Sequence, residues 1–263
     1  PETLETIGTP ALVLDREALM RNVARMDAAL ARHHVPLRQH VKTAKSVEVA
    51  RIAGHAHGAA ITVSTLREAE HFAAAGFADQ VYAVGLVPTK VARIAALTHQ
   101  GVRVRAITDD LDAVAALDEA ARAAEAALEI LVEIDVGQHR GGIAPDSDVL
   151  LEIAAAIARA PAVSPAGVLA HGGHAYDCSG PDDLARVAEE ERAGAVHAAE
   201  RLRQAGHAAP IVSVGSTPTA LFARDLRGVT EVRAGVFVFM DLFQSALGCA
   251  PVEDVALSVL ASV

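Results

Sequence analysis

Residues 35–45 read Val35-Pro-Leu-Arg-Gln-His-Val-Lys-Thr-Ala-Lys45, an apolar segment that leads into two closely spaced lysines. Residues 35–41 are typical of a buried strand that opens a strand–loop–helix unit. The chain has only three lysines against twenty arginines, and Lys42 and Lys45 are two of them. A lysine amine can lose its proton and attack a carbonyl carbon, which a guanidinium cannot do. Lys42 is therefore either a Schiff-base lysine at a strand end or one of two surface lysines that precede a helix.

Outward from this unit, apolar and β-branched segments alternate with helical patterns. The predicted strands are 11–14, 37–41, 60–63, 80–84, 102–107, 128–134, 164–170, 211–214 and 231–234. The predicted helices are 16–32, 47–56, 67–75, 89–99, 111–124, 147–159 and 181–204. This alternation predicts a parallel sheet with crossover helices, and the eight units counted from Leu37 predict an α/β fold of the (β/α)8 TIM-barrel type. An open doubly wound sheet is the alternative, although no G-x-G-x-x-G follows the first strand.

Both ends of the sequence carry strand patterns that the barrel does not need. We expect residues 1–15 to supply the N-terminal strand of a second, β-rich domain and residues 16–245 to form the barrel. Residues 246–263, which close on the apolar stretch 255–263, are expected to start a C-terminal β domain that the chain largely lacks. The alternative is a barrel with two irregular ends.

The composition narrows the class of protein. The 263 residues suit one barrel of about 250 residues, and the net charge of −10 argues against nucleic acid or an anionic membrane as a partner. No apolar run reaches the ~20 residues of a membrane span, and no signal peptide is visible. Two cysteines are too few for a disulfide framework, so we expect a cytoplasmic enzyme.

Two polar motifs follow predicted strands, and barrel active sites are built at those ends. Strand 128–134 runs into E-I-D-V-G-Q-H-R, where Arg140 either turns toward a ligand or forms a structural pair with Asp135. Strand 164–170 runs into H-G-G-H-A-Y, in which two glycines allow close backbone approach beside His171 and Tyr176. The H-x-x-H spacing could also indicate a metal, but two ligands are weak evidence.

The last two predicted strands end in patterns suited to an anion. Gly215-Ser-Thr-Pro-Thr219 leads into a helix and predicts a phosphate site at the helix start, with a plain N-cap as the alternative. Arg233 and Gly235 follow the final strand, where the arginine either reaches a cofactor ring or forms a buried ion pair. Together with the amine of Lys42, these features suit pyridoxal 5′-phosphate (PLP).

Five motifs occur in order: K-T-A-K, E-x-D-x-G-x-x-R, H-G-G-H-x-Y, G-S-T-P-T and T-E-V-R-x-G-x-x-x-F-M-D. They resemble the fold type III PLP enzymes, the alanine-racemase-like barrels, and within these the D-threonine aldolase and D-serine dehydratase branch. The opening T-P-A-L-V-L-D, the stretch 62–70 and V-A-L-S-V-L-A near the end match the same branch, so the resemblance spans nearly the whole chain. Ala44 departs from it, because many relatives have histidine there.

The resemblance implies a role for each matching residue. The residues implied to be catalytic are Lys42, His171 and Tyr176. The residues implied to bind PLP are Lys42 through a Schiff base, Arg140 at the phenolic oxygen, His171 against the ring, Arg233 near the ring nitrogen, Tyr176 toward the substrate, and Gly215, Ser216, Thr217 and Gly235 at the phosphate.

The resemblance also implies an activity and its partners. We expect a PLP- and metal-dependent aldolase (Mn²⁺, Mg²⁺ or Zn²⁺) that cleaves β-hydroxy-D-amino acids to glycine and an aldehyde, and that forms a homodimer. The metal ligands cannot be assigned and are expected in the missing C-terminal domain. One alternative is a D-serine or 3-hydroxy-D-aspartate dehydratase on the same fold, and another is a non-catalytic PLP-binding protein.

Overall fold

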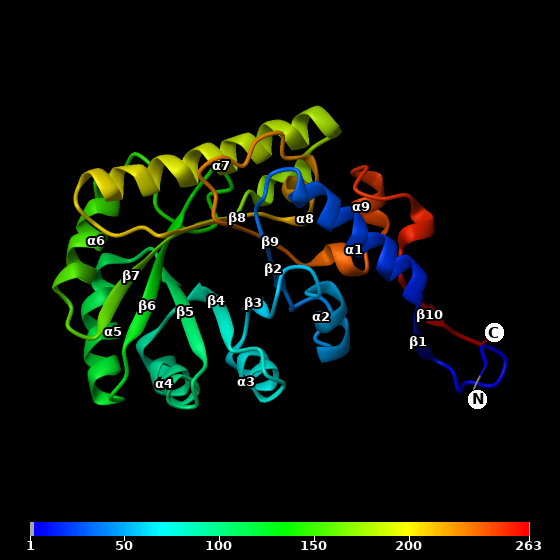
Figure 1. The fold of residues 1–263 in the computed structure, drawn as a ribbon, viewed down its shortest axis with the longest axis horizontal. Coiled ribbons are helices and arrows are strands. Elements are labelled where there is room, and N and C mark those ends of the chain that lie inside the picture. The colour runs from blue at the N-terminus through cyan, green and yellow to red at the C-terminus, as the bar shows by residue number, and fades with distance from the viewer. Residues whose placement is uncertain (1–2, 263) are drawn as a thin grey trace.

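A computed structural model describes residues 3–262 of the chain. Within them, eight parallel strands form a closed barrel in sequence order, and the last strand pairs with the first (Figure 1). The strands are β2 (Leu37–His40), β3 (Ala60–Val63), β4 (Asp79–Gly85), β5 (Arg103–Thr108), β6 (Leu128–Ile134), β7 (Val163–Ala170), β8 (Ile211–Val214) and β9 (Glu231–Ala234). The predicted (β/α)8 barrel is confirmed.

Helices connect the strands and cover the outside of the barrel, as Figure 1 shows. They are α1 (Arg16–Ala31), α2 (Val47–Ala53), α3 (Leu66–Ala74), α4 (Val91–His99), α5 (Leu111–Ala123), α6 (Val149–Arg159), α7 (Pro181–Gln204), α8 (Thr217–Phe222) and α9 (Leu242–Ala246). Several helices begin at an N-cap residue whose side chain accepts a hydrogen bond from a backbone N–H of the first turn. These N-cap residues include Asp15, Ser46, Thr65 and Asp110. These side chains satisfy N–H groups that the first turn of a helix leaves without partners.

Helix α2 ends at Ala53, three residues before the predicted end at residue 56. Gly54 caps the helix, and its N–H bonds back to the carbonyl of Ala50. A Cβ at position 54 would lie 2.7 Å from the carbonyl oxygen of Gly58, so a glycine is needed where the chain leaves the helix. The short 3₁₀ helices Gly173–Asp177, Val236–Val238 and Val252–Asp254, as well as α9, were not predicted because single turns carry no periodic signal.

The terminal strands form a separate two-stranded sheet. Strand β1 (Ala11–Leu14) pairs antiparallel with β10 (Leu257–Leu260), and both lie near the chain ends in Figure 1. Asp254, just before β10, forms ion pairs with Arg21 and Arg25 of α1, which fix this sheet beside the barrel. The assignment of residues 1–15 and 246–263 to a second domain stays a prediction, and Pro1, Glu2 and Val263 lie outside the described residues.

The barrel interior is polar at the strand starts. Arg38 donates to Glu231 and Asp79 at 2.8 Å each, and Arg105 pairs with the same Asp79 at 2.6 Å. Buried guanidinium groups need such partners, and here they close this end of the barrel. A cavity lies at the opposite end of the barrel, where the strands finish. No helix in residues 3–262 is both long and apolar enough to cross a membrane.

Candidate active site

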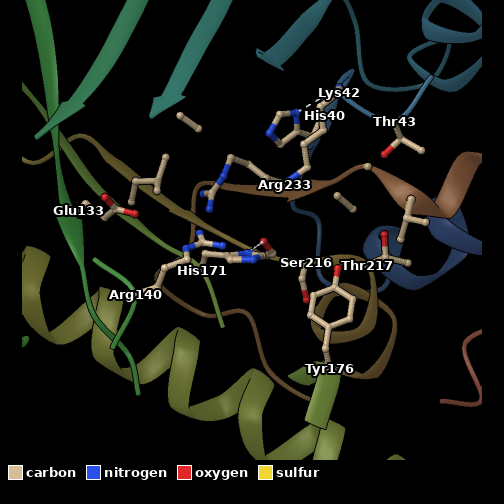
Figure 2. Close-up of a pocket in the computed structure, with 16 residues that line it drawn as sticks. His40, Lys42, Thr43, Glu133, Arg140, His171, Tyr176, Ser216, Thr217 and Arg233 are labelled. Atoms are coloured by element: carbon tan, nitrogen blue, oxygen red, sulfur yellow. Dashed lines mark hydrogen bonds between the residues drawn. The ribbon is translucent and has the colours of Figure 1, made fainter. Parts of the chain in front are cut away.

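A cavity that is partly open to solvent lies at the C-terminal ends of the barrel strands. All nine site residues predicted from the sequence line it: Lys42, Arg140, His171, Tyr176, Gly215, Ser216, Thr217, Arg233 and Gly235. Figure 2 shows the labelled side chains converging on the cavity from separate strand ends, with Arg233 and His171 in the middle. Cationic groups outnumber the one carboxylate of the lining, that of Glu133, so the cavity suits an anion.

Lys42 is the second residue after β2, within the turn that follows the strand, and it lines the cavity. Partial burial lowers the pKa of this amine, and the positive charges of Arg140 and Arg233 lower it further. A lowered pKa increases the share of neutral amine, which is the nucleophilic form. Lys45 does not line the cavity. Its amine lies 3.9 Å from the carboxylate of Glu68 instead.

His171 is the first residue after β7. Its Nδ1 lies 3.1 Å from the carbonyl oxygen of Gly215, so Nδ1 carries the proton in the neutral ring and Nε2 is left as an acceptor. Burial lowers the pKa of His171 to about 4, and the charges of Arg233, Arg140 and Lys42 add to this effect. The imidazole is therefore neutral near pH 7.

Arg233 is 4% exposed and lies inside the barrel. Its guanidinium donates to Ser213 Oγ at 2.7 Å and to the carbonyl oxygen of Ala170 at 2.6 Å. Among residues 3–262 it has no carboxylate within ion-pair distance, so the alternative of a buried ion pair is not formed. Burial lowers the pKa of Arg233, and Glu191 is the carboxylate that most opposes this shift.

Arg140 projects into the cavity from the loop after β6 (Figure 2). The alternative pair with Asp135 is not formed, because Asp135 accepts from the N–H groups of Gly137 and His139 and from His139 Nδ1. In the described part of the chain, Arg140 has neither a hydrogen-bond nor an ion-pair partner. A charged group held without a partner is available to a ligand.

The loop after β8 approaches β9 too closely for a side chain. Gly215 has φ +124°, and a Cβ there would lie 2.5 Å from the carbonyl oxygen of Arg233. At Gly235 a Cβ would lie 2.8 Å from the carbonyl oxygen of His40. The two glycines, together called the cradle, therefore let the chain after β8 and β9 lie directly against neighbouring backbone at the cavity. Ser216 is the N-cap of α8 and forms a complete capping box with Thr219. The N-cap that the sequence offered as the alternative to a phosphate site is therefore formed.

Tyr176 enters the cavity from the 3₁₀ turn after β7, and its ring stacks on Phe243 at 6.1 Å. Burial raises the pKa of its phenol, which therefore stays protonated near neutral pH. The neighbouring His174 lies 3.3 Å from a carboxylate oxygen of Glu190. Residues 3–262 contain no group of three His, Cys, Asp or Glu residues that could hold a metal ion.

The sequence analysis did not assign His40, Thr43 or Glu133 to the site, although all three line the cavity. His40 lies two residues before Lys42, and the two-residue period of a strand would have placed both on one face. Burial lowers the pKa of His40 to about 2, and the charge of Lys42 contributes. Burial raises the pKa of Glu133, so this acid holds its proton more tightly than a solvated one.

Comparison with known proteins shows what the chain is similar to. The family described as alanine racemase, N-terminal domain, matches residues 14–242. D-threo-3-hydroxyaspartate dehydratase from Delftia sp. (strain HT23) is 46% identical over 262 residues, which cover 100% of this chain and 69% of that protein. Its solved structure superimposes with a TM-score of 0.96 over 98% of this chain and 68% of that one. 

Two aldolases are similar at lower identity. The 3-hydroxy-D-aspartate aldolase of Paracoccus denitrificans (strain Pd 1222) is 32% identical over 89% of this chain and 61% of that protein. The structure of D-threonine aldolase from Filomicrobium marinum is 27% identical, with a TM-score of 0.86 over 97% of this chain and 69% of that one. The chain thus spans about two thirds of the length of these relatives.

Proposed function

The chain belongs to the alanine racemase N-terminal domain family, and from this membership we propose that it is the PLP-binding barrel of a lyase for β-hydroxy-D-amino acids. The observation that carries the proposal is the gathering of Lys42, Arg140, His171 and Arg233 around one cationic cavity at the strand ends. Each of these groups suits a different part of PLP.

The cavity suits PLP in charge. The cradle of Gly215 and Gly235 packs directly on neighbouring backbone, which lets the chain after β8 and β9 line one corner of the cavity, where the phosphate would lie. Ser216 and Thr217 line the same corner, while the unpaired guanidinium of Arg140 is free for the phenolic oxygen. The buried guanidinium of Arg233 lies near the centre of the cavity (Figure 2), where the ring nitrogen would lie.

When bound, PLP supplies an electron sink that stabilises negative charge at the substrate Cα. Lys42 holds the cofactor through its amine, and the lowered pKa lets this amine also accept a proton. His171, with its proton on Nδ1, presents an unprotonated Nε2 to the cavity. Tyr176, whose raised pKa keeps its phenol protonated, can donate a hydrogen bond to a substrate oxygen.

We place dehydration ahead of aldol cleavage, which reverses the order expected from the motifs. The relative that is 46% identical over the whole chain bears the name of a 3-hydroxyaspartate dehydratase, while the aldolases are less similar. Loss of the β-hydroxyl as water followed by hydrolysis of the imine gives a keto acid and ammonia. Aldol cleavage remains the second candidate, since it uses the same substrate class and the same cofactor.

We further propose a divalent metal (Mn²⁺, Mg²⁺ or Zn²⁺) and a homodimer. One structure of a D-threo-3-hydroxyaspartate dehydratase variant, 46% identical to this chain, is described as a metal-free form, which implies a metal in that enzyme. The described residues of this chain contain no group of three His, Cys, Asp or Glu side chains that could hold it.

Product analysis tests the proposal. The full-length protein is incubated with PLP, Mn²⁺ and each of D-threonine, D-serine and the stereoisomers of 3-hydroxyaspartate. A keto acid and ammonia from a 3-hydroxy-D-aspartate isomer support the dehydratase, and glycine with an aldehyde supports the aldolase. PLP bound without turnover of any of these compounds would contradict a lyase and support a non-catalytic PLP-binding protein.

A further inference from the structure

Helix α7 buries a glutamate that has no part in the chemistry described above. The buried residues of this helix, all within the described chain, are Leu184, Ala185, Val187, Ala188, Glu191, Ala195, Ala198, Ala199 and Leu202. Glu191 alone among them is charged, and it is 1% exposed. Burial of a carboxylate destabilises a fold unless hydrogen bonds compensate, so an apolar side chain would suit this helix face better.

The hydrogen bonds of Glu191 go to two loops of the cavity. Its Oε1 accepts from the N–H of Gly172 at 2.7 Å and from the N–H of Gly215 at 2.9 Å. Gly172 follows His171 at the end of β7, and Gly215 opens the phosphate cradle at the end of β8. One carboxylate oxygen therefore joins the loop of the proposed ring-contacting histidine to the loop of the proposed phosphate site.

A second hydrogen bond joins the same two loops directly. The carbonyl oxygen of Gly215 lies 3.1 Å from His171 Nδ1, while the N–H of the same residue bonds to Glu191. His171, Gly172, Glu191 and Gly215 thus form a closed ring of contacts. The position of the imidazole and the position of the phosphate cradle are set together.

The packing around Glu191 leaves little freedom. A Cβ at Gly172 would lie 3.4 Å from both Cβ and Cδ of Glu191, so the loop rests directly on this side chain. Glu191 is also the carboxylate that most favours the charged form of Arg233. The same side chain therefore acts on three proposed PLP contacts: His171, the Gly215 cradle and Arg233.

We infer that Glu191 is a positioning residue that holds the His171 loop and the Gly215 cradle at the spacing that PLP requires. It touches neither cofactor nor substrate and acts through the two backbone N–H groups. The inference rests on the proposed function in one respect, the identity of the group that the two loops hold. The link between the loops is independent of that identity.

The test compares three variants of the full-length protein. Glu191→Leu removes the acceptor, Glu191→Gln retains an acceptor oxygen without the charge, and Leu202→Ala weakens the same helix face away from the cavity. The readouts are the PLP dissociation constant, kcat and KM of the loaded enzyme, and amide hydrogen exchange in peptides that contain Gly172 and Gly215, measured without PLP.

We expect Glu191→Leu to raise the PLP dissociation constant by about tenfold or more, as loss of hydrogen bonds to a charged acceptor does, and to lower kcat more than it changes KM. Exchange at both glycine peptides should accelerate. Glu191→Gln should restore PLP affinity to within about threefold of the unsubstituted protein, and Leu202→Ala should change only global stability.

Unchanged PLP affinity and unchanged exchange at both glycines in Glu191→Leu would overturn the inference, as would equal effects from Leu202→Ala. If Glu191→Leu does not fold, Glu191→Gln decides. Amide exchange at the rate of the unsubstituted protein in the peptides that contain Gly172 and Gly215 supports the link. Faster exchange in both peptides of this folded variant refutes it. If the unsubstituted protein binds no PLP, the proposed function fails, while the exchange measurement still decides the role of Glu191.

Discussion

Replacement of His171 by Asn tests whether the imidazole in the cavity is buried in its neutral form. Asn retains an N–H donor near the position of Nδ1, so the bond to the carbonyl oxygen of Gly215 can persist. The variant loses only the group that titrates. The pKa of His171 is about 4 in the folded protein, against an ordinary value of 6.5.

The sign and size of the effect follow from this difference. The unfolded chain takes up the histidine proton near pH 6.5 and the folded protein only near pH 4, so stability is present above this window and is lost as the pH falls through it. A difference of about 2.5 pKa units corresponds to at most ~3.4 kcal/mol. Between about pH 7 and about pH 4.5, roughly 2 kcal/mol of this is lost.

The assay is urea unfolding of the PLP-free protein, followed by far-ultraviolet circular dichroism at these two pH values. The free energy of unfolding of His171→Asn should fall by about 2 kcal/mol less than that of the unsubstituted protein. His40, with a pKa of about 2, and the acids Glu133 and Glu191, with raised pKa values, are present in both proteins and contribute to both curves. Equal losses in the two proteins would refute a buried, neutral His171.

Two further substitutions separate stability from cofactor binding. Gly215→Ala places a Cβ 2.5 Å from the carbonyl oxygen of Arg233 at φ +124° and should cost about 3 kcal/mol or more of unfolding free energy, as well as PLP affinity. Gly206→Ala, with φ +85° and no atom within 4 Å of its Cβ, is the matched control and should cost about 1 kcal/mol with PLP affinity unchanged. Arg140→Leu should change the unfolding free energy by no more than ~0.5 kcal/mol yet raise the PLP dissociation constant at least about tenfold. Equal costs at the two glycines, or unchanged affinity in Arg140→Leu, would contradict these arguments.

The barrel and most of its site were predictable because they depend on local signals. Alternating strands and helices indicate a parallel barrel, and its strand ends meet at one mouth, so residues just after each strand must come together. Lys42, Arg140, His171 and Gly215 all follow a strand in this way, and all line the cavity. The sequence did not decide whether Asp135 pairs with Arg140, because the two residues lie in the same short loop and the arginine could reach either this carboxylate or a ligand.

What could not be predicted depends on contacts between distant segments. Glu191 lies in the middle of a helix, 24 residues from Gly215, and nothing local connects it to a cavity. Its place on the apolar face, four residues after Val187 and four before Ala195, was the available signal. The choice between loss of water and cleavage of a carbon–carbon bond also lies outside these motifs, because both reactions use the same cofactor and substrate class.

Borohydride reduction of the PLP-loaded protein, followed by peptide mass spectrometry, shows whether Lys42 binds PLP. Reduction fixes PLP to the amine that carries it, and the chain offers only Lys42, Lys45 and Lys90 as lysine amines. We expect a phosphopyridoxyl group on Lys42 and none on Lys45 or Lys90. A label on either of these two lysines with Lys42 unmodified, or no label at all, would contradict it.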